Sequence, residues 1–386
     1  MIPPICVKYK VEHWIEISSA FYFAERMVRL VRNTMNFVDL CRGEFGRKVA
    51  YTGVDRITPQ NVVKVVSDTI GIHNRNRTLI DYLYRYMKGD QPILYRNKIV
   101  RPEVNNRVVE NHAFETVKFK AGQICGEPIQ YVCKKKNADE KINEQVDLLN
   151  DYLDEANADA RNIQRAIYQS ATGTSYKAIL KEEDWTKNGD LPPFRIFIPY
   201  PGDCYIVYSQ RNGKPMLSVQ ILKDEDEQQY YLCYSKNQFF EIKNGKVTNY
   251  GINGFGGIPI VECPNNHDRL SDVEIAITLF DAINKYQSDR LNGVEQFVQA
   301  FMKFKNCEVD ENEFLKMVKL GAISVKDTGN GCQSDVELMT AELNQSESQV
   351  AKDDIYNNML IVEAMPNRQS NSGGDTGNAV YLRNGW

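Results

Sequence analysis

The chain has 386 residues, of which 42% are hydrophobic and 25% are charged, and its formal net charge is −4. This length exceeds what one ordinary hydrophobic core supports, so two or more folding units are expected. The composition excludes an intrinsically disordered chain, and no apolar run approaches the roughly 18–20 residues that a membrane span needs. The apolar first residues carry Glu12, His13 and Glu16 and lack a basic leading region, so no signal peptide is expected.

The nine cysteines show no Cys-x-x-Cys spacing, and the chain has only four histidines. Such a set is typical of reduced, mostly buried thiols in a protein made in the cytosol. The sequence therefore predicts no metal site and no cofactor.

Charge is distributed unevenly along the chain. Residues 271–365 contain 17 acids and 8 bases and carry −9, which leaves +5 for the remainder. Proteins that grip nucleic acid through its phosphates usually show a basic excess. The chain as a whole does not show this excess, and its acids concentrate in one segment.

The N-terminal half reads as helical. Residues 1–57 contain no motif that places them, although 19–42 could form a helix. Thr58-Pro59 is a typical helix opening, because a hydroxyl caps the first turn and proline is favoured at the first helical position. The apolar spacing that follows predicts helices after this opening and at 77–88, 105–124, 140–157 and 158–171.

From Phe194 to Val261 the texture changes to short alternating runs such as RIFIPY, CYIVY and LSVQIL. Asn212-Gly213 and Asn244-Gly245 lie between such runs, and Asn-Gly is a strong hairpin signal because both central residues of the turn need positive φ. We predict a meandering antiparallel sheet of about five or six strands. The run Gly251–Gly257 lacks the flanking strand and helix of a dinucleotide fingerprint and is interpreted as a connection at the sheet edge.

Ser271 to Glu274 form a capping box, in which serine and glutamate side chains satisfy free N–H groups at the start of a helix. Apolar residues at helical spacing continue to about Asn306, interrupted by a polar stretch at 284–290. A helix of about 35 residues would be about 52 Å long. Such a helix needs support from neighbours, which we expect to be other subunits.

A small α/β insert is predicted for 307–342, with a helix at 312–319 and strands at 322–325 and 336–343. A second long helix then runs to Met365 and ends before Pro366. The polar run PNRQSNSGGDTGN follows it. This run lacks the Gly-Lys-Ser/Thr of a phosphate-binding loop and follows no predicted strand, so no NTP site is expected.

Several stretches of the first half resemble a known family. YMKG at 86–89 and QPIL at 91–94 are similar to its N-terminal YYxGxHPIL pattern. NNRVVEN at 105–111, followed by Gly122 and by GEPI at 126–129, looks like its most specific segment.

The second half continues the resemblance. GIPIVECPNN at 257–266 runs into SDVE at 271–274 and DAINKYQSD at 281–289, which is similar to the family's signature before a long helix. DTGNAVYLRNG at 375–385 resembles the sequence after its channel loop. Over residues 58–386 the chain is thereby identified as a member of the portal protein family of tailed bacteriophages, of the SPP1-like type.

The resemblance implies an α+β portal fold. Its parts would be an unplaced N-terminal extension at 1–57, a wing at 58–270 with helices over 58–171 and antiparallel strands over 194–263, stem helices at 271–306 and 343–365, a small α/β clip at 307–342, a tunnel loop at 366–378, and the start of a wing helix at 379–386. In the family the chain continues from there into a C-terminal crown, and no residues of this sequence are expected to form that part.

The resemblance also implies a function, that of a non-enzymatic ring of about twelve subunits at one capsid vertex of a virion, assembled in the bacterial host cytoplasm. Double-stranded DNA would pass through the ring during packaging and ejection. The other implied partners are the terminase large subunit, a head-completion or adaptor protein, and the major capsid and scaffolding proteins. No membrane partner is expected.

Three sets of residues are expected to carry this function. The tunnel-loop set, close to DNA, is Asn367, Arg368, Gln369, Ser370, Asn371, Ser372, Gly373, Gly374, Asp375 and Gly377. The stem set, lining the channel, is Glu347, Lys352, Asp353, Asp354 and Glu363. The clip set, docking partners, is Glu308, Asp310, Glu311, Glu313, Lys316, Lys319, Lys326 and Asp327.

An acidic channel wall would suit the passage of DNA, which carries a phosphate charge per roughly 1.7 Å of axis and would be trapped by a basic wall. The −9 balance of 271–365 fits this idea, although the clip acids could instead face docking partners. Arg368 is the only base of the loop and could touch phosphate transiently, and the loop glycines allow it to move.

Two alternatives remain open at this point. The adjacent acids Asp353 and Asp354 could hold a metal in an enzyme that processes nucleic acid, although a solvated or pore-facing surface is the commoner role for such acids. No nucleophile elbow, zinc-protease motif or kinase motif accompanies them. The second alternative is another structural protein of a virion or tail baseplate.

Overall fold

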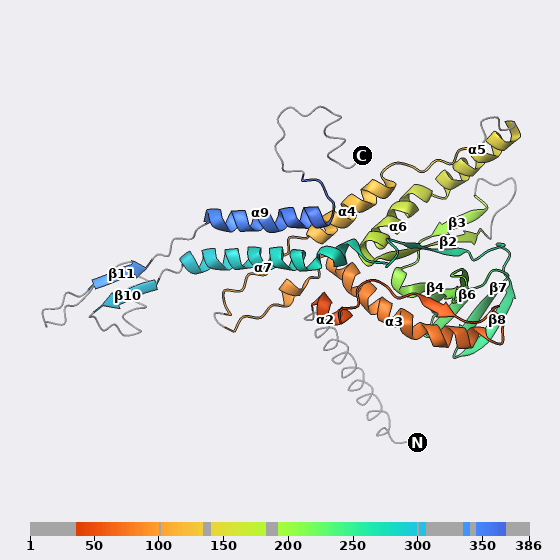
Figure 1. Ribbon diagram of the computed structural model, residues 1–386, viewed down its shortest axis with the longest axis horizontal. Coiled ribbons are helices and arrows are strands. Elements are labelled where there is room, and N and C mark those ends of the chain that lie inside the picture. The colour runs from red at the N-terminus through yellow and green to blue at the C-terminus, as the bar shows by residue number, and fades with distance from the viewer. Residues whose placement is uncertain are drawn as a thin grey trace, which may run out of the picture.

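A computed structural model describes residues 36–99, 102–133, 140–182, 192–298, 301–305, 335–339 and 345–367. Figure 1 shows an elongated molecule with the sheets at one end and two long helices, α7 and α9, running side by side toward the other end. The helices are α2 (Phe37–Cys41), α3 (Val62–Met87), α4 (His112–Cys125), α5 (Glu140–Glu155), α6 (Ala158–Thr172), α7 (Asp272–Val298) and α9 (Gln345–Val362), with short 3-10 turns η1 (Pro92–Tyr95) and η2 (Pro201–Asp203). None of the helices in the described ranges is both long and apolar enough to cross a membrane.

Two sheets form the other layer of the fold. The larger sheet has the order β1-β4-β5-β6-β7-β8, and the smaller has the order β3-β2-β9. Their strands are β1 (Ala50–Thr52), β2 (Thr174–Lys181), β3 (Phe194–Phe197), β4 (Cys204–Ser209), β5 (Pro215–Lys223), β6 (Gln229–Tyr234), β7 (Gln238–Lys243), β8 (Lys246–Ile252) and β9 (Ile260–Pro264). The prediction of an antiparallel meander is confirmed for β4 to β8, but the expectation of a single sheet is wrong.

The sequence missed β1 and β2 for two different reasons. β1 is only three residues long and pairs in parallel with β4, so no hairpin signal announces it. β2 follows helix α6 directly through Gly173, which has a φ of +83°. A Cβ on Gly173 would lie 2.0 Å from the carbonyl oxygen of Arg269, so only glycine allows the helix to pass into the strand here.

The two Asn-Gly pairs form different turns. Asn244 and Gly245 have φ values of +49° and +70°, and together they make the two-residue hairpin between β7 and β8 that the sequence predicts. Of the other pair only Gly213 has a positive φ, and the register between β4 and β5 shifts beside this turn. The turn at Asn212-Gly213 therefore lies where the sequence predicts a turn, but it is not the expected two-residue turn with positive φ at both central residues.

Helix α3 is one continuous helix of 26 residues, where the sequence suggested two. Its central polar residues do not break it, because Thr69 donates to the carbonyl oxygen of Val65 and His73 bonds the carbonyl oxygen of Gly202 at 2.8 Å. The helix also begins later than expected. Thr58 and Pro59 form a turn, and Asn61 accepts a hydrogen bond from the Thr58 N–H before the helix starts.

Residues 36–57 are packed into the fold, whereas the sequence left 1–57 as an unplaced extension. Phe37 is only 1% exposed, and its ring lies 5.5 Å from that of Tyr82. The Gly46 N–H donates to the carboxylate of Glu274 at 2.6 Å, next to the start of α7. This segment therefore belongs to the core that supports the long helices.

Helix α7 ends at Val298, about 40 Å from its start, instead of continuing to 306. Residues Phe301–Lys305 form β10, which pairs antiparallel with β11 (Asp335–Met339). The predicted strand at 336–343 overlaps β11. The helix predicted at 312–319 and the strand at 322–325 lie outside the described residues.

A hydrophobic core joins the long helices to the body. It gathers buried side chains from α3, α4, α7 and α9, among them Tyr82, Leu83, Tyr86, Val117, Ile277, Phe280, Met359 and Leu360. Because α9 contributes Met359 and Leu360 at 0% and 3% exposure, this helix is anchored at its C-terminal end.

Candidate functional site

The segment before α4 is extended and runs along α7, although its spacing predicted a helix from 105. The N–H groups of Asn106, Val108 and Glu110 donate to side-chain oxygens of α7, at 2.7, 2.9 and 2.8 Å. The acceptors are Asn292, Ser288 and Asn284 in that order.

Simple geometry explains why these bonds repeat. Two residues of extended chain rise about 6.6 Å, and four residues of helix rise about 6.0 Å, so every second residue of one meets every fourth residue of the other. Asn284 and Ser288 are 0% exposed and Asn292 is 3% exposed. The polar stretch that interrupts the apolar pattern of the long helix thus supplies hydrogen-bond acceptors for main-chain N–H groups of the extended segment, which has no neighbouring strand to supply them.

Neighbouring motifs meet at the same place. Gln91 is fully buried and donates to Asn111 at 3.0 Å and to the carbonyl oxygen of Tyr86 at 3.1 Å, while Asn284 donates to Gln91. The Tyr86 hydroxyl donates to Asp281 at 2.8 Å. We call this set, Tyr86, Gln91, 105–111 and 281–292, the motif junction.

The motif junction shows what the sequence reasoning missed. The stretches 86–94, 105–111 and 281–289 each suggest a family by themselves, but nothing in them says that they touch. The available signal was the four-residue spacing of Asn284, Ser288 and Asn292, which places all three on one helix face. The junction therefore holds residues 105–111 along α7 through hydrogen bonds to its side chains.

Asn292→Leu is expected to destabilise the fold by about 1–3 kcal/mol, because the part-buried Asn106 N–H loses its acceptor. Urea unfolding followed by circular dichroism measures the change. Asn358→Leu is the matched control, since Asn358 is exposed on α9 and should change stability by less than about 0.5 kcal/mol. Equal effects of the two variants would contradict a supporting role of the junction.

Glu110 links the junction to α9. Its carboxylate accepts a hydrogen bond from Lys352 at 2.7 Å and contacts His112 at 3.3 Å, and His112 contacts Glu115 at 2.9 Å on its other side. The bond to His112, with help from Lys352, lowers the pKa of Glu110 despite partial burial. Burial would lower the pKa of His112, but its two carboxylate partners raise it.

The residues of the predicted stem set therefore differ in burial: Lys352 is paired, three acids are exposed, and Glu363 is buried. Lys352 is 80% buried and engaged by Glu110, so it does not offer a free cation. Glu347, Asp353 and Asp354 are exposed, and Lys352 is the only base in α9, so the charged side chains exposed on this helix are all carboxylates. In the described part of the chain no three His, Cys, Asp or Glu residues gather around Asp353 and Asp354, or elsewhere, as metal ligands would.

Glu363 departs from the expectation that it shares that exposed face. It is 3% exposed, directly after α9, and its Oε1 has no hydrogen-bond partner among the described residues. Its main-chain carbonyl accepts a hydrogen bond from Lys120 of α4. Burial, and the nearby Asp272 carboxylate, raise the pKa of Glu363 to about 8, although Lys120 acts in the opposite direction.

Stability is expected to fall by about 2 kcal/mol between pH 6 and pH 8 on account of Glu363. The carboxyl is protonated in the folded chain at pH 6 but ionised in the unfolded chain, so raising the pH favours unfolding. Asp281, whose pKa burial raises only to about 6, titrates mostly below this window. Across this window the urea midpoint should fall less steeply with pH in Glu363→Gln than in the wild-type chain, whereas Glu347→Gln should keep the wild-type slope. His112, whose pKa its carboxylate partners raise, adds a fall of the same sign that both variants retain. An unchanged slope in Glu363→Gln would refute this origin.

The other predicted sets lie almost entirely outside the described residues. Of the tunnel-loop set only Asn367 is described, and its side chain donates to that of Asn357 at 2.8 Å. The remaining tunnel-loop residues (Arg368, Gln369, Ser370, Asn371, Ser372, Gly373, Gly374, Asp375 and Gly377) and the whole clip set (Glu308, Asp310, Glu311, Glu313, Lys316, Lys319, Lys326 and Asp327) fall in ranges that are not described.

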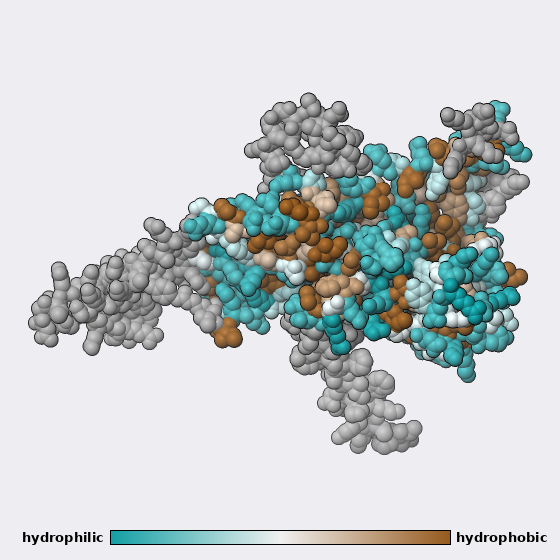
Figure 2. Space-filling view, in the orientation of Figure 1, coloured by the Kyte–Doolittle hydropathy of each residue, from teal (hydrophilic) through white to brown (hydrophobic). Residues whose placement is uncertain are grey.

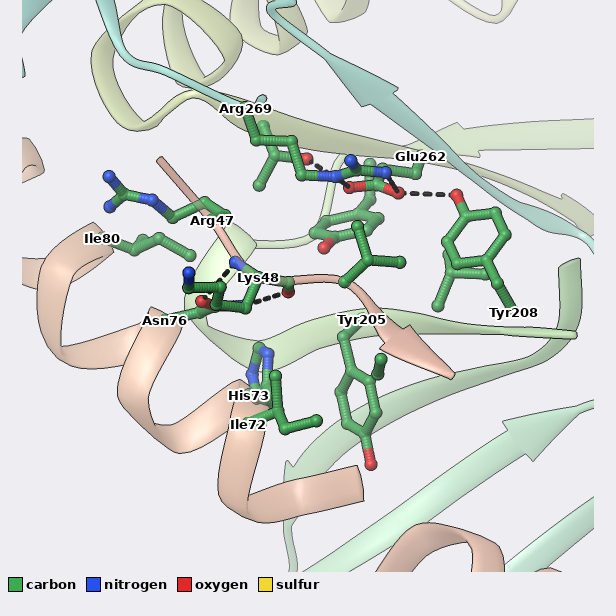
Figure 3. Close-up of a pocket in the computed structure, with 15 residues that line it drawn as sticks. Arg47, Lys48, Ile72, His73, Asn76, Ile80, Tyr205, Tyr208, Glu262 and Arg269 are labelled. Carbon is green, nitrogen blue, oxygen red and sulfur yellow. Dashed lines mark hydrogen bonds and ion pairs between the residues drawn. The ribbon is translucent and has the colours of Figure 1, made fainter. Parts of the chain in front are cut away.

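A small cavity lies between α3 and the sheets (Figure 3). It measures about 20 Å³, which is room for roughly one water molecule and not for a nucleotide. His73 lines it, stacked on Tyr205 with ring centroids 4.6 Å apart. Burial lowers the pKa of His73 to about 4, so it is neutral near pH 7 and acts as a structural residue.

Comparisons with known proteins match most of this chain. The family model described as phage portal protein, SPP1 Gp6-like, matches residues 67–382. The portal protein of Bacillus phage SPP1 is 23% identical over 309 residues, which cover 72% of this chain and 57% of that protein. The chain thus spans somewhat more than half the length of this relative.

Two solved structures are similar at low identity. The neck of an empty GTA particle, computed with C6 symmetry, is 12% identical, with a TM-score of 0.42, and the match covers 77% of this chain and 72% of that one. The neck of a native GTA particle, computed with C12 symmetry, is 13% identical, with a TM-score of 0.36 over 69% and 67% of the two chains.

The family match confirms the resemblance seen in the motifs. It spans most of the chain and includes the motif junction together with α7 and α9. The chain therefore belongs to the SPP1 Gp6-like family of phage portal proteins.

Proposed function

We propose that the chain is one subunit of a ring-shaped channel at a capsid vertex, through which double-stranded DNA is packaged and ejected. The observation that carries this proposal is the family match over residues 67–382. In this proposal the protein is assembled in the host cytoplasm and acts at the portal vertex of the virion. The ring would contain about twelve subunits, each using two different complementary faces.

The two long helices are the proposed stem. α7 and α9 stand side by side and lead to the β10–β11 pair, of which β11 would belong to the clip (Figure 1). The exposed face of α9 offers Glu347, Asp353 and Asp354 without a free base. If this surface faced the channel, its carboxylates would repel the DNA phosphates, so the wall would not hold the duplex and DNA could slide past it.

Apolar side chains on the stem would supply part of the subunit contact. Val350 and Ile361 are 69% and 75% exposed on α9, and Leu291 and Val294 are 40% and 39% exposed on α7. Figure 2 shows hydrophobic residues gathered on the visible surface over α9 and α4. Exposed apolar area of this kind is typical of a surface that another chain covers.

The same proposal includes the individual partner proteins of the ring. The clip at 307–342 would dock the terminase large subunit and a head-completion protein, and the wing would meet capsid and scaffolding proteins. Residues 366–378 would form the tunnel loop. Energy for packaging would come from the terminase, so the purified chain is expected to show neither ATPase nor nuclease activity.

Negative-stain electron microscopy of the purified protein is expected to show rings. The variant Val350→Asp/Ile361→Asp should shift the population to monomers with little loss of monomer stability, because both side chains are exposed. Asn358→Asp, which adds one charge on the same helix, is the control and should keep its rings. Monomers alone from the wild-type chain under all conditions would count against the proposed ring.

A further inference from the structure

A groove of about 430 Å³ lies where the two sheets part. The small core between the sheets, which includes Ile206 and Ile260, ends at this groove, and both residues line it. Ile258 and Pro215 extend the apolar wall. The volume and the mostly apolar lining fall in the range of sites that bind a ligand or a peptide.

One side of the groove is an open strand edge. β9 lies at the border of the three-stranded sheet and pairs only with β2 in the described structure. Val261 of β9 is 56% exposed and lines the groove. An edge strand presents main-chain N–H and C=O groups to any extended chain that lies beside it.

The carboxylate in the groove is already engaged. Glu262 accepts hydrogen bonds from Arg269 at 2.7 and 2.9 Å, and from the Tyr208 hydroxyl at 2.6 Å (Figure 3). Only 5% of its side chain is exposed. This pair contributes no free charge to the groove.

Two lysines leave the groove positively charged. Lys214 and Lys236 line it, and both are exposed. Neither forms an ion pair with a carboxylate in the described part of the chain. The groove thus combines an apolar floor, an open strand edge and two uncompensated cations.

We propose that this groove binds an extended segment of a partner protein, in which apolar residues alternate with carboxylates, as a strand added to β9. A fatty acid would leave the edge N–H and C=O groups of β9 unused. Among the described edge strands of a second copy, β1, β3 and β8 carry no acid, and Glu262 of β9 is already engaged. Only β11 alternates acids with apolar residues, and self-association through such a strand is an outcome of the test below. The charge of the groove selects an acidic partner.

Three labelled peptides test the proposal on the full chain by fluorescence anisotropy: acetyl-(Val-Glu)₃, acetyl-(Val-Lys)₃, and the first of these with N-methyl groups on its valines. The Val-Glu peptide should bind about tenfold or more tighter than the Val-Lys peptide. N-methylation should lower the affinity of the Val-Glu peptide by about tenfold or more, because it blocks the strand hydrogen bonds.

Lys214→Glu/Lys236→Glu should invert the preference between the two peptides. Lys64→Glu/Lys246→Glu is the control, since both of its lysines are exposed, lie outside the groove and change the net charge equally. Thermal unfolding checks that each variant folds. The proposal would be overturned if neither peptide bound, if both peptides bound equally, or if N-methylation left binding unchanged. It would also be overturned if the chain bound no peptide but self-associated, and the groove variant abolished that self-association. None of these outcomes depends on ring formation, so the test is separate from that of the channel.

Discussion

Glu274→Gln is expected to destabilise the chain by about 3–5 kcal/mol, because it leaves a buried arginine without its counter-charge. The Arg47 and Glu274 side chains are 1% and 0% exposed and joined at 2.5 Å. Only Nη2 of Arg47 donates to Glu274, and its Nε and Nη1 have no hydrogen-bond partner among the described residues. Burial lowers the pKa of Arg47, and Glu274 works against this effect, so the ion depends on this one carboxylate.

The same carboxylate also accepts from the N–H groups of Gly46, at 2.6 Å, and of Ser271, at 3.0 Å. Glu274 thereby completes the capping box and ties residues 46–47 to the start of α7. A glutamine can keep one of these bonds but not the charge. The loss should therefore appear as a lower urea midpoint and as earlier exposure of α7 in hydrogen exchange.

An exposed ion pair provides the control. Asp55 and Arg211 are both 70% exposed, and Asp55→Asn should cost less than about 1 kcal/mol. Replacing both buried partners, as in Arg47→Met/Glu274→Gln, should recover part of the loss, since no unpaired charge remains. If Glu274→Gln were as stable as the wild-type chain, the buried pair would not be what fixes α7 to the body.

Deletion of 369–375 is expected to leave rings intact and to abolish most DNA packaging. The deletion lies after Met365, the last described residue of the core that also contains Met359 and Leu360 of α9, so the described packing between α7, α9 and the body is untouched. The proposed tunnel loop would, however, lose its reach toward DNA. Packaged DNA per particle, measured by nuclease protection, is the readout, and electron microscopy of the variant checks the rings.

A variant with a loop of the same length distinguishes the role of the length of the loop from the role of its side chains. Replacing 369–375 by an equally long Gly-Ser run keeps the span of the loop and removes its side chains. Packaging that returns with this variant would assign the loop a role through its length alone. Normal packaging by the deletion variant would refute a tunnel-loop role for these residues, while the assignment of the stem would stand.

The sequence by itself determined the elements whose causes are local. The apolar spacing of 158–171 matches α6, the Ser271–Glu274 box starts α7, and Asn244-Gly245 makes the turn between β7 and β8. Each depends on residues within a few positions of one another, and a single sequence contains all of that information. Its long motifs determined the family as well.

Only the tertiary structure decided which distant residues share a contact. Residues 105–111 have helical spacing but are extended, because α7 offers Asn284, Ser288 and Asn292 as acceptors in register. Glu363 reads as a member of an acidic helix face, yet the end of α9 buries it against Lys120 and Asp272. In both cases the outcome is set by hydrogen bonding and burial between segments more than 90 residues apart in sequence, for which periodicity and composition carry no signal.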